Sequence, residues 1–225
     1  KIEFDIIYSC YSLDLPERLS KLSKFGFNES EKELITCSLR KLTNSIIHPN
    51  TGLWKQDAKK IDILRSRRES LINSESPILG KIYWLIEDAK RYGTLPFAGL
   101  ARTGFIAVQI LRSLVNVGIF SQKESDLFIG DITTISGQLK QDRSLINRRS
   151  FLKKYGHLRP GTYDILVPRY DEQPDIYFDW NHKPEEAEDI EPFSLSLKKM
   201  KEISQLLKQH KLEIDVVSFF DFIQS

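Results

Sequence analysis

The chemically richest stretch of the sequence lies between residues 155 and 171, where an imidazole, guanidinium groups, phenols and carboxylates are interspersed with glycine and proline. Its candidate anion-binding side chains are His157, Arg159, Tyr163, Asp164 and Arg169. Arginines on a rigid loop suit bidentate binding of an anion, and a histidine can move protons or position a phosphate. A network of arginines and carboxylates that pins a loop to nearby helices would use the same residue types. Both interpretations stay open from the residue types alone.

Arg102 is a second candidate because it lies inside an apolar stretch from Leu95 to Gly118. A buried guanidinium needs a partner, since an unpaired buried charge costs several kcal/mol. Asp164 or another carboxylate would make this a structural ion pair, whereas a bound anion would make it a binding site. His48 and His210 are predicted at helix C-termini, where a cation suits the helix dipole, and they carry less weight.

Motifs for self-sufficient catalysis are missing from the sequence. It contains no P-loop, no GxGxxG, no GxSxG and no HExxH pattern. Cys10 and Cys37 form no CxxC or Cys/His cluster, so no metal ligands are assigned. The net charge of +2 and the lack of a long basic stripe argue against nucleic-acid binding. We assign no catalytic residue and no cofactor to this chain acting alone.

Helical patterns dominate the elements that must position these residues, and they predict an all-α bundle in one domain, 1–225. The segment Lys1–Tyr8 alternates polar and apolar residues up to Asp5, which suits one short N-terminal strand. Five prolines and several aromatic residues between Pro160 and Pro192 predict a long irregular loop. The predicted helices are 14–26, 30–47 opened by a Ser30/Glu33 capping box, 59–71, 77–93 ending at Gly93, 95–118, one opened by a Ser121/Glu124 capping box, 131–146, 194–210 and 214–223.

The stretch 95–118 is apolar nearly all round, which predicts a central, buried helix. Five of its side chains should be almost inaccessible: Phe105, Ile106, Ile110, Leu111 and Leu114. In the preceding helix, Ile78, Ile82, Leu85 and Ile86 are expected to face inward. No signal peptide or transmembrane pattern is found, so we expect a cytoplasmic protein. Because the chain begins without Met, we expect a piece of a longer protein.

Two segments together resemble the central helical region of phosphoenolpyruvate-synthase-like phosphotransferases. They are Thr94–Val115, which includes Leu-Pro-Phe-Ala-Gly-Leu-Ala-Arg, and Tyr155–Tyr170, which includes Tyr-Gly-His-Leu-Arg-Pro-Gly-Thr-Tyr-Asp-Ile. The chain is similar, over most of its length, to the helical domain that binds the antibiotic in rifampin phosphotransferase.

The resemblance implies a larger machine in which an ATP-grasp domain, using ATP and Mg²⁺, phosphorylates a histidine on a mobile carrier domain. This chain carries neither part, so those domains are the implied partners, together with a small-molecule acceptor. The first hypothesis is that the chain forms the acceptor site, with Arg102, His157, Arg159 and Arg169 around the transferred phosphoryl group. The second is a structural spacer without a ligand site. Exposure of Arg102, His157 and Arg159 in one open pocket would favour the first hypothesis, and burial of these three side chains in pairs would favour the second.

Overall fold

The computed structural model describes residues 8–132, 134–161, 164, 166–180 and 193–224. Every regular element within these ranges is helical, which confirms the predicted all-α class. The expected N-terminal strand falls on residues 1–7, outside the described residues. Where the sequence predicts a single domain, the chain divides into two compact units, and each is described by itself. Unit 1 comprises Lys1–Ser125 with Ser194–Ser225, and unit 2 comprises Asp126–Phe193.

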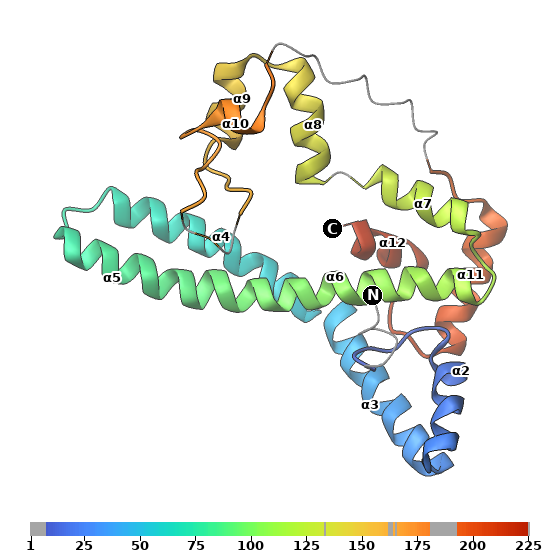
Figure 1. Cartoon of the computed structure of the whole chain (residues 1–225). Coiled ribbons are helices and arrows are strands. Elements are labelled where there is room, and N and C mark those ends of the chain that lie inside the picture. Colours follow the sequence, from blue (N-terminus) through green and yellow to red (C-terminus); the bar gives the residue numbers. More distant parts are fainter. Residues whose placement is uncertain (1–7, 133, 162–163, 165, 181–192, 225) are drawn as a thin grey trace. The chain divides into compact units, whose positions relative to one another are not determined.

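Unit 1 begins with a helical hairpin built from α2 (Leu15–Ser20), the short η1 (Lys21–Phe25) and α3 (Glu29–Ile47) (Figure 1). The capping box of α3 lies two residues earlier than predicted. Asn28 Oδ1 accepts from the Glu31 backbone N–H, and Glu31 Oε2 accepts from that of Asn28, both at 2.9 Å. The prediction from Ser30 was wrong because Asn28 has the extended backbone of a cap, with φ −85° and ψ 170°.

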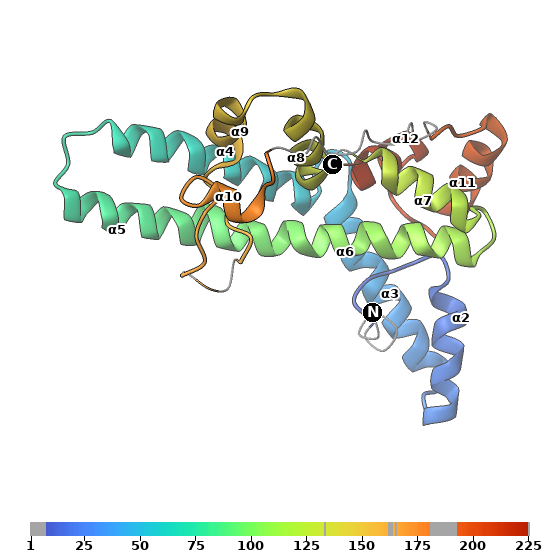
Figure 2. The same ribbon diagram turned by 45° about the horizontal axis from the view of Figure 1, so that its top comes forward.

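A long helical run forms the middle of unit 1. After α4 (Leu53–Ile72), α5 (Ile78–Asp88) continues through the π-helical η2 (Ala89–Thr94) into α6 (Leu95–Asn116), giving 39 residues without a break. Helix α4 lies alongside this run (Figure 2). The predicted end at Gly93 was therefore wrong. The wider π turn comes directly before Pro96, whose ring would clash with the carbonyl four residues earlier in a regular α-helix.

Burial along α6 differs from the prediction in its first half. Ile106, Ile110, Leu111 and Leu114 are at most 2% exposed, as expected, but Phe105 is 53% exposed. Helix α6 contacts α4, α3 and α12, and Phe105 lies on a part of its surface that is open to solvent. Gly99 allows α4 to approach closely, since a Cβ at this position would overlap the Asp57 carboxylate of α4.

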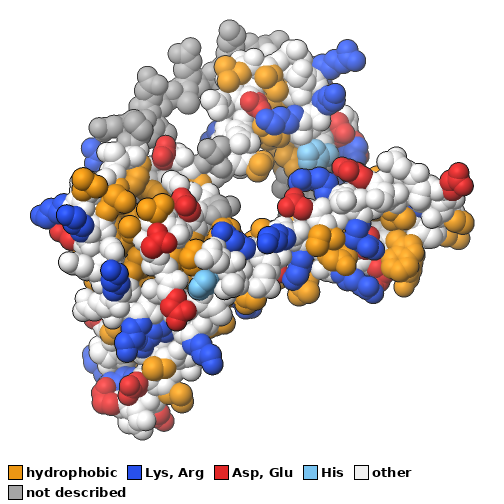
Figure 3. Space-filling model, turned by 180° about the vertical axis from the view of Figure 1, so that it is seen from behind, with side chains coloured by type: hydrophobic (Ala, Val, Ile, Leu, Met, Phe, Trp, Pro, Cys, Tyr) orange, Lys and Arg blue, Asp and Glu red, His pale blue; other side chains and the backbone are white. Residues whose placement is uncertain are grey.

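The inward face predicted for α5 was also wrong. Its apolar side chains Ile78, Ile82, Leu85 and Ile86 are between 36% and 74% exposed. Figure 3 shows hydrophobic side chains open to solvent along the α4–α5 hairpin. Among the described residues, the helical run Ile78–Asn116 is long enough and apolar enough to cross a membrane, judged by length and composition alone. Core helices of soluble proteins also meet these two criteria.

The core of unit 1 forms where α11 (Leu197–Gln209) and α12 (Val216–Gln224) join α3 and α6. Buried hydroxyls tie the N-terminal segment to this core: Tyr11 N–H donates to Thr43 Oγ1 at 2.8 Å, and Leu13 N–H donates to Ser113 Oγ at 3.1 Å. The core side chains are Leu15, Leu19, Ile46, Ile47, Ile110, Leu114, Ile203, Leu207, Leu212 and Phe219.

Helix α7 (Gln122–Asp131) runs from unit 1 into unit 2, and its predicted capping box is confirmed. Glu124 Oε2 accepts from the Ser121 backbone N–H at 2.9 Å. Hydrogen bonds from Lys199 and then from Ser121 lower the pKa of Glu124 to about 2. This carboxylate therefore links the start of α7 to α11.

Unit 2 contains α8 (Ile135–Leu145), α9 (Arg148–Tyr155) and the short α10 (Pro174–Tyr177). Side-chain caps open α8 and α9: Thr134 accepts from Gly137 N–H at 3.0 Å, and Asn147 accepts from Ser150 N–H at 2.9 Å. The prediction of irregular structure after Pro160 holds for the described residues except at α10, where Pro174 occupies a first-turn position. Residues 181–192 of that loop lie outside the described residues.

Candidate functional site

The loop that carries His157 is closed on itself by backbone hydrogen bonds in unit 2. Asp171 N–H donates to the Gly156 carbonyl, and Tyr170 N–H donates to the Leu158 carbonyl, each at 3.0 Å. These bonds bring residues 156–158 beside residues 170–171. A Cβ on Gly156 would overlap the Leu152 carbonyl oxygen and lie 2.8 Å from Asp171 Cβ, so only glycine fits at this crossing. The segment that carries His157 and Arg159 is thus joined to the segment that carries Arg169.

An aromatic cluster supports the base of this loop. Phe151, Tyr155 and Phe178 are at most 7% exposed, and Tyr170, Tyr177 and Trp180 pack against them. The Phe151 and Phe178 rings meet edge to face with centroids 5.1 Å apart. Such contacts add to the energy of area burial, so the cluster stabilises α9 against the segment after the loop.

Asp142 joins α8 to α9 in the same unit. Its carboxylate accepts from Lys154 Nζ at 2.6 Å and from the Tyr155 hydroxyl at 2.8 Å. The hydrogen bond from Lys154, followed by that from Tyr155, lowers the pKa of Asp142. The hydrogen bond to Asp142, followed by that to Tyr155, raises the pKa of Lys154. The helix that leads into the His157 loop is therefore fixed at its last turn.

The candidate side chains of the loop differ in their surroundings. His157 is exposed, and Arg159 is half-buried. Arg169 forms a bidentate pair with Asp171, with Nε to Oδ1 at 2.9 Å and Nη2 to Oδ2 at 3.2 Å, and Glu172 lies 3.4 Å from Nε. Arg169 is therefore neutralised by carboxylates from its own segment.

Asp164 does not add to a charged cluster in the described structure. The Asp164 carboxylate accepts from the Leu166 backbone N–H at 2.8 Å, which is a local turn. Tyr163 lies outside the described residues. Of the predicted set, the structure joins the segments that carry His157, Arg159 and Arg169.

Arg102 lies in unit 1, on α6, and its side chain is exposed. The prediction of a buried guanidinium was wrong, because α6 turns this position away from the helices that cover it. Because the Arg102 guanidinium is exposed to solvent, its charge does not need a partner.

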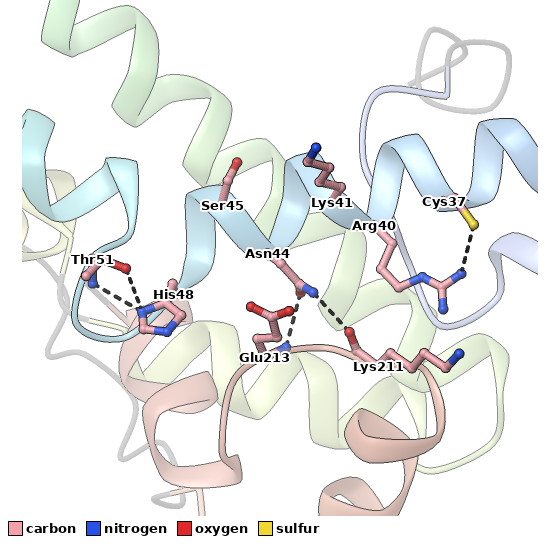
Figure 4. A pocket seen from close by; sticks show the side chains of 9 residues that line it. All are labelled: Cys37, Arg40, Lys41, Asn44, Ser45, His48, Thr51, Lys211 and Glu213. Carbon is pink, nitrogen blue, oxygen red and sulfur yellow. Dashed lines mark hydrogen bonds between the residues drawn. The ribbon is translucent and has the colours of Figure 1, made fainter.

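A groove that the sequence did not single out lies in unit 1, between α3 and the segment after α11 (Figure 4). Its volume is about 550 Å³. Its lining residues are Cys37, Arg40, Lys41, Asn44, Ser45, His48, Thr51, Lys211 and Glu213. No motif marks it, because its two sides are more than 160 residues apart in the chain. In the sequence, the adjacent basic residues Arg40 and Lys41 were the one feature that could have pointed to this groove.

Two side chains give this groove a defined shape. Asn44, which is buried, donates to the Lys211 carbonyl at 3.0 Å and accepts from Glu213 N–H at 3.1 Å, so it bridges the two sides. His48 Nδ1 accepts from the backbone N–H groups of Asn50 and Thr51 at 3.2 and 3.1 Å. His48 Nδ1 is therefore occupied as an acceptor, which leaves Nε2 as the ring nitrogen that can donate to a ligand.

Within the described part of the chain, no cluster of histidine, cysteine, aspartate and glutamate side chains has the arrangement of a metal site. Compared with protein-family models, with curated proteins and with solved structures, the chain matches none.

Proposed function

We propose that this chain is the acceptor-side helical domain of a cytoplasmic phosphoenolpyruvate-synthase-like phosphotransferase. In this proposal an ATP-grasp domain and a phosphohistidine carrier domain of the same protein are its partners. ATP and Mg²⁺ are held by the ATP-grasp domain, and no residue of this chain binds them. The acceptor is a small molecule with a nucleophilic hydroxyl.

One observation supports this role above the others: the loop that resembles the family signature is braced at its base and leaves the His157 side chain exposed. A braced loop holds a catalytic group in place without reorganisation, which is what transfer of a phosphoryl group requires of its surroundings. Arg159, half-buried on the same loop, can present a planar guanidinium to phosphoryl oxygens.

The proposed transfer exchanges one bond to phosphorus for another. The acceptor oxygen forms a bond to phosphorus while the bond between phosphorus and the carrier imidazole nitrogen breaks, and the bonding electrons leave with the carrier. His157 takes the proton of the acceptor hydroxyl. Arg159 binds the non-bridging oxygens, whose charge it balances. Arg169 supports this arrangement through Asp171 and does not contact the phosphoryl group.

A structural spacer is the second candidate, and the bidentate pair between Arg169 and Asp171 favours it. In that case His157 and Arg159 matter only for the loop's stability.

The test uses the protein that carries all three domains, with its carrier histidine labelled from radioactive ATP. Discharge of the label is followed after addition of a small-molecule extract of the source cells. The variants His157→Ala and Arg159→Lys should slow the discharge by about 100-fold or more while the melting temperature changes little. Lys153→Ala, which removes an exposed charge from the preceding helix, is the matched control.

Normal discharge per folded molecule in both variants, together with a lower melting temperature, would refute the acceptor role and support the spacer. A second measurement is made on the chain alone. It should neither hydrolyse ATP nor take up a stable label from it, and a stable label would contradict its assignment to the acceptor side.

A further inference from the structure

The groove between α3 and residues 211–213 concentrates positive charge without carboxylate partners. Arg40, Lys41 and Lys211 line it, and none of them forms an ion pair with any residue that the structure describes. The Arg40 guanidinium lies over the Tyr11 ring, 5.4 Å from its centroid, and otherwise reaches only Cys37 Sγ at 3.8 Å. Contact with the ring orients the guanidinium and leaves most of its N–H groups available to a ligand.

The backbone at Lys211 gives independent support. Its φ of 55° makes it the single non-glycine residue with positive φ among those described. Helix α11 ends in a Schellman motif, with Leu212 N–H bonded to the Leu207 carbonyl at 2.9 Å and Lys211 N–H to the Lys208 carbonyl at 3.0 Å.

The end of α6 provides the comparison, since the same motif there has Gly118, with φ 78°, in the corresponding position. Glycine takes this conformation without strain, whereas a lysine is strained in it. The capping bonds use only backbone atoms, so they do not explain why a lysine stands at position 211. What the lysine adds is an ammonium group at the groove.

The shape and hydrogen-bonding groups of the groove narrow the class of ligand. A volume of about 550 Å³ is in the range of small-molecule sites. Glu213 is the one carboxylate among the lining residues. It repels a second phosphate group and can accept a hydrogen bond from a hydroxyl of the ligand.

We propose that this groove binds a small phosphate monoester that also carries a hydroxyl group. A phosphate monoester has a charge near −2 at neutral pH, which the cations offset after allowance for Glu213. Arg40 binds phosphate oxygens with its planar fork, and Lys41 and Lys211 contribute point charges. Asn44 keeps the two sides of the groove at a fixed separation. The site is separate from the His157 loop and does not depend on the role proposed for that loop.

Calorimetric titration of the whole chain with glycerol phosphate tests the proposal, with glycerol and inorganic sulfate as comparison ligands. Glycerol phosphate should bind saturably, sulfate more weakly, and glycerol not at all. Absence of saturable binding of glycerol phosphate, or equal binding of sulfate, would refute a monoester site. Vesicles containing lysophosphatidic acid, whose headgroup carries both a phosphate monoester and a free glycerol hydroxyl, form a second arm. Tighter binding of these vesicles than of glycerol phosphate would support the site and assign a lipid as the source of the monoester.

Three variants separate binding from folding. Lys211→Gly relieves the positive-φ strain, so the melting temperature should stay the same or rise while the affinity for glycerol phosphate falls about ten-fold. Arg40→Lys keeps the charge but loses the fork, and it should also weaken binding. Lys201→Ala removes an exposed charge from α11 outside the groove and should leave the affinity unchanged. Unchanged affinity in Lys211→Gly, or an equal loss in Lys201→Ala, would overturn the proposal.

Discussion

The two cation-rich regions of the chain differ in what their guanidinium groups contact. In unit 2, Arg169 is held by Asp171 and Glu172, residues two and three positions further along the chain. In unit 1, Arg40 contacts an aromatic ring and a thiol, and Lys41 and Lys211 have no carboxylate within ion-pair distance among the described residues. A cation with a carboxylate partner braces its segment, whereas a cation without one remains available to an anion. The number of basic residues in a motif is therefore a poor guide to where an anion binds.

The largest expected effect is the loss of the aromatic cluster that supports the His157 loop. Phe151 is fully buried at its centre, so Phe151→Ala should reduce the free energy of unfolding of unit 2 by about 3–5 kcal/mol. Hydrogen exchange of the amides of residues 170 and 171 should accelerate by the factor that corresponds to this loss of unfolding free energy. Amides of α3 beside the groove serve as the internal control, and equal acceleration there would show that the two units do not unfold separately.

Gly156→Ala should come next in size. The added methyl group would overlap the Leu152 carbonyl and crowd Asp171, and overpacking of this kind costs about 1–3 kcal/mol. Gly80→Ala in α5 is the matched control, because its methyl group meets no atom within 4 Å. It should stabilise the helix by about 0.5–1 kcal/mol. Chemical denaturation of both variants measures the contrast, and a neutral Gly156→Ala would mean that the base of the loop can relax.

A direct comparison of paired and unpaired cations should give a smaller effect. Arg169→Ala removes an ion pair whose two side chains are 43% and 40% exposed, so its loss should cost about 1 kcal/mol or less. Lys41→Ala, which removes a cation without a carboxylate partner, should change the free energy of unfolding by less than about 0.5 kcal/mol. Denaturant titrations at low and high salt test this difference. A larger loss of stability in Lys41→Ala would mean that the groove cations are structural.

The pH dependence of unit 1 gives the smallest expected effect. Burial, followed by the charge of Arg40, lowers the pKa of His210, whose Nδ1 lies 2.7 Å from the Tyr11 hydroxyl. A histidine with a lowered pKa binds fewer protons in the folded state than in the unfolded state, so its contribution to stability is complete above about pH 6.5 and is lost as the pH falls through the folded-state pKa.

The wild type should therefore lose more stability than His210→Gln between pH 7 and pH 5, as measured by chemical denaturation at each pH. An equal pH dependence in the two proteins would contradict the assignment of this titration to His210.

Local sequence signals determined much of the secondary structure. The Ser121/Glu124 capping box formed as predicted, and α11 covers most of its predicted range. The interruption expected at Gly93 did not form, because a π-helical stretch accommodates Pro96 and α4 packs alongside the run. Signals of this kind act over a few residues, so they predict an element better than they predict its ends.

Burial and partners were decided by the tertiary structure. Hydrophobicity alone placed Arg102 and Phe105 inside, but exposure depends on which face of α6 is covered by other helices. The sequence did identify the His157 stretch as a rigid loop, since its glycines and prolines act locally. It could not identify the groove, because Asn44 and Lys211 meet only through the packing of α3 against the end of α11. The sequence by itself thus determined an all-α chain with an irregular, polar loop. Only the tertiary structure decided which cations have a carboxylate partner, because ion pairing depends on distances that folding sets.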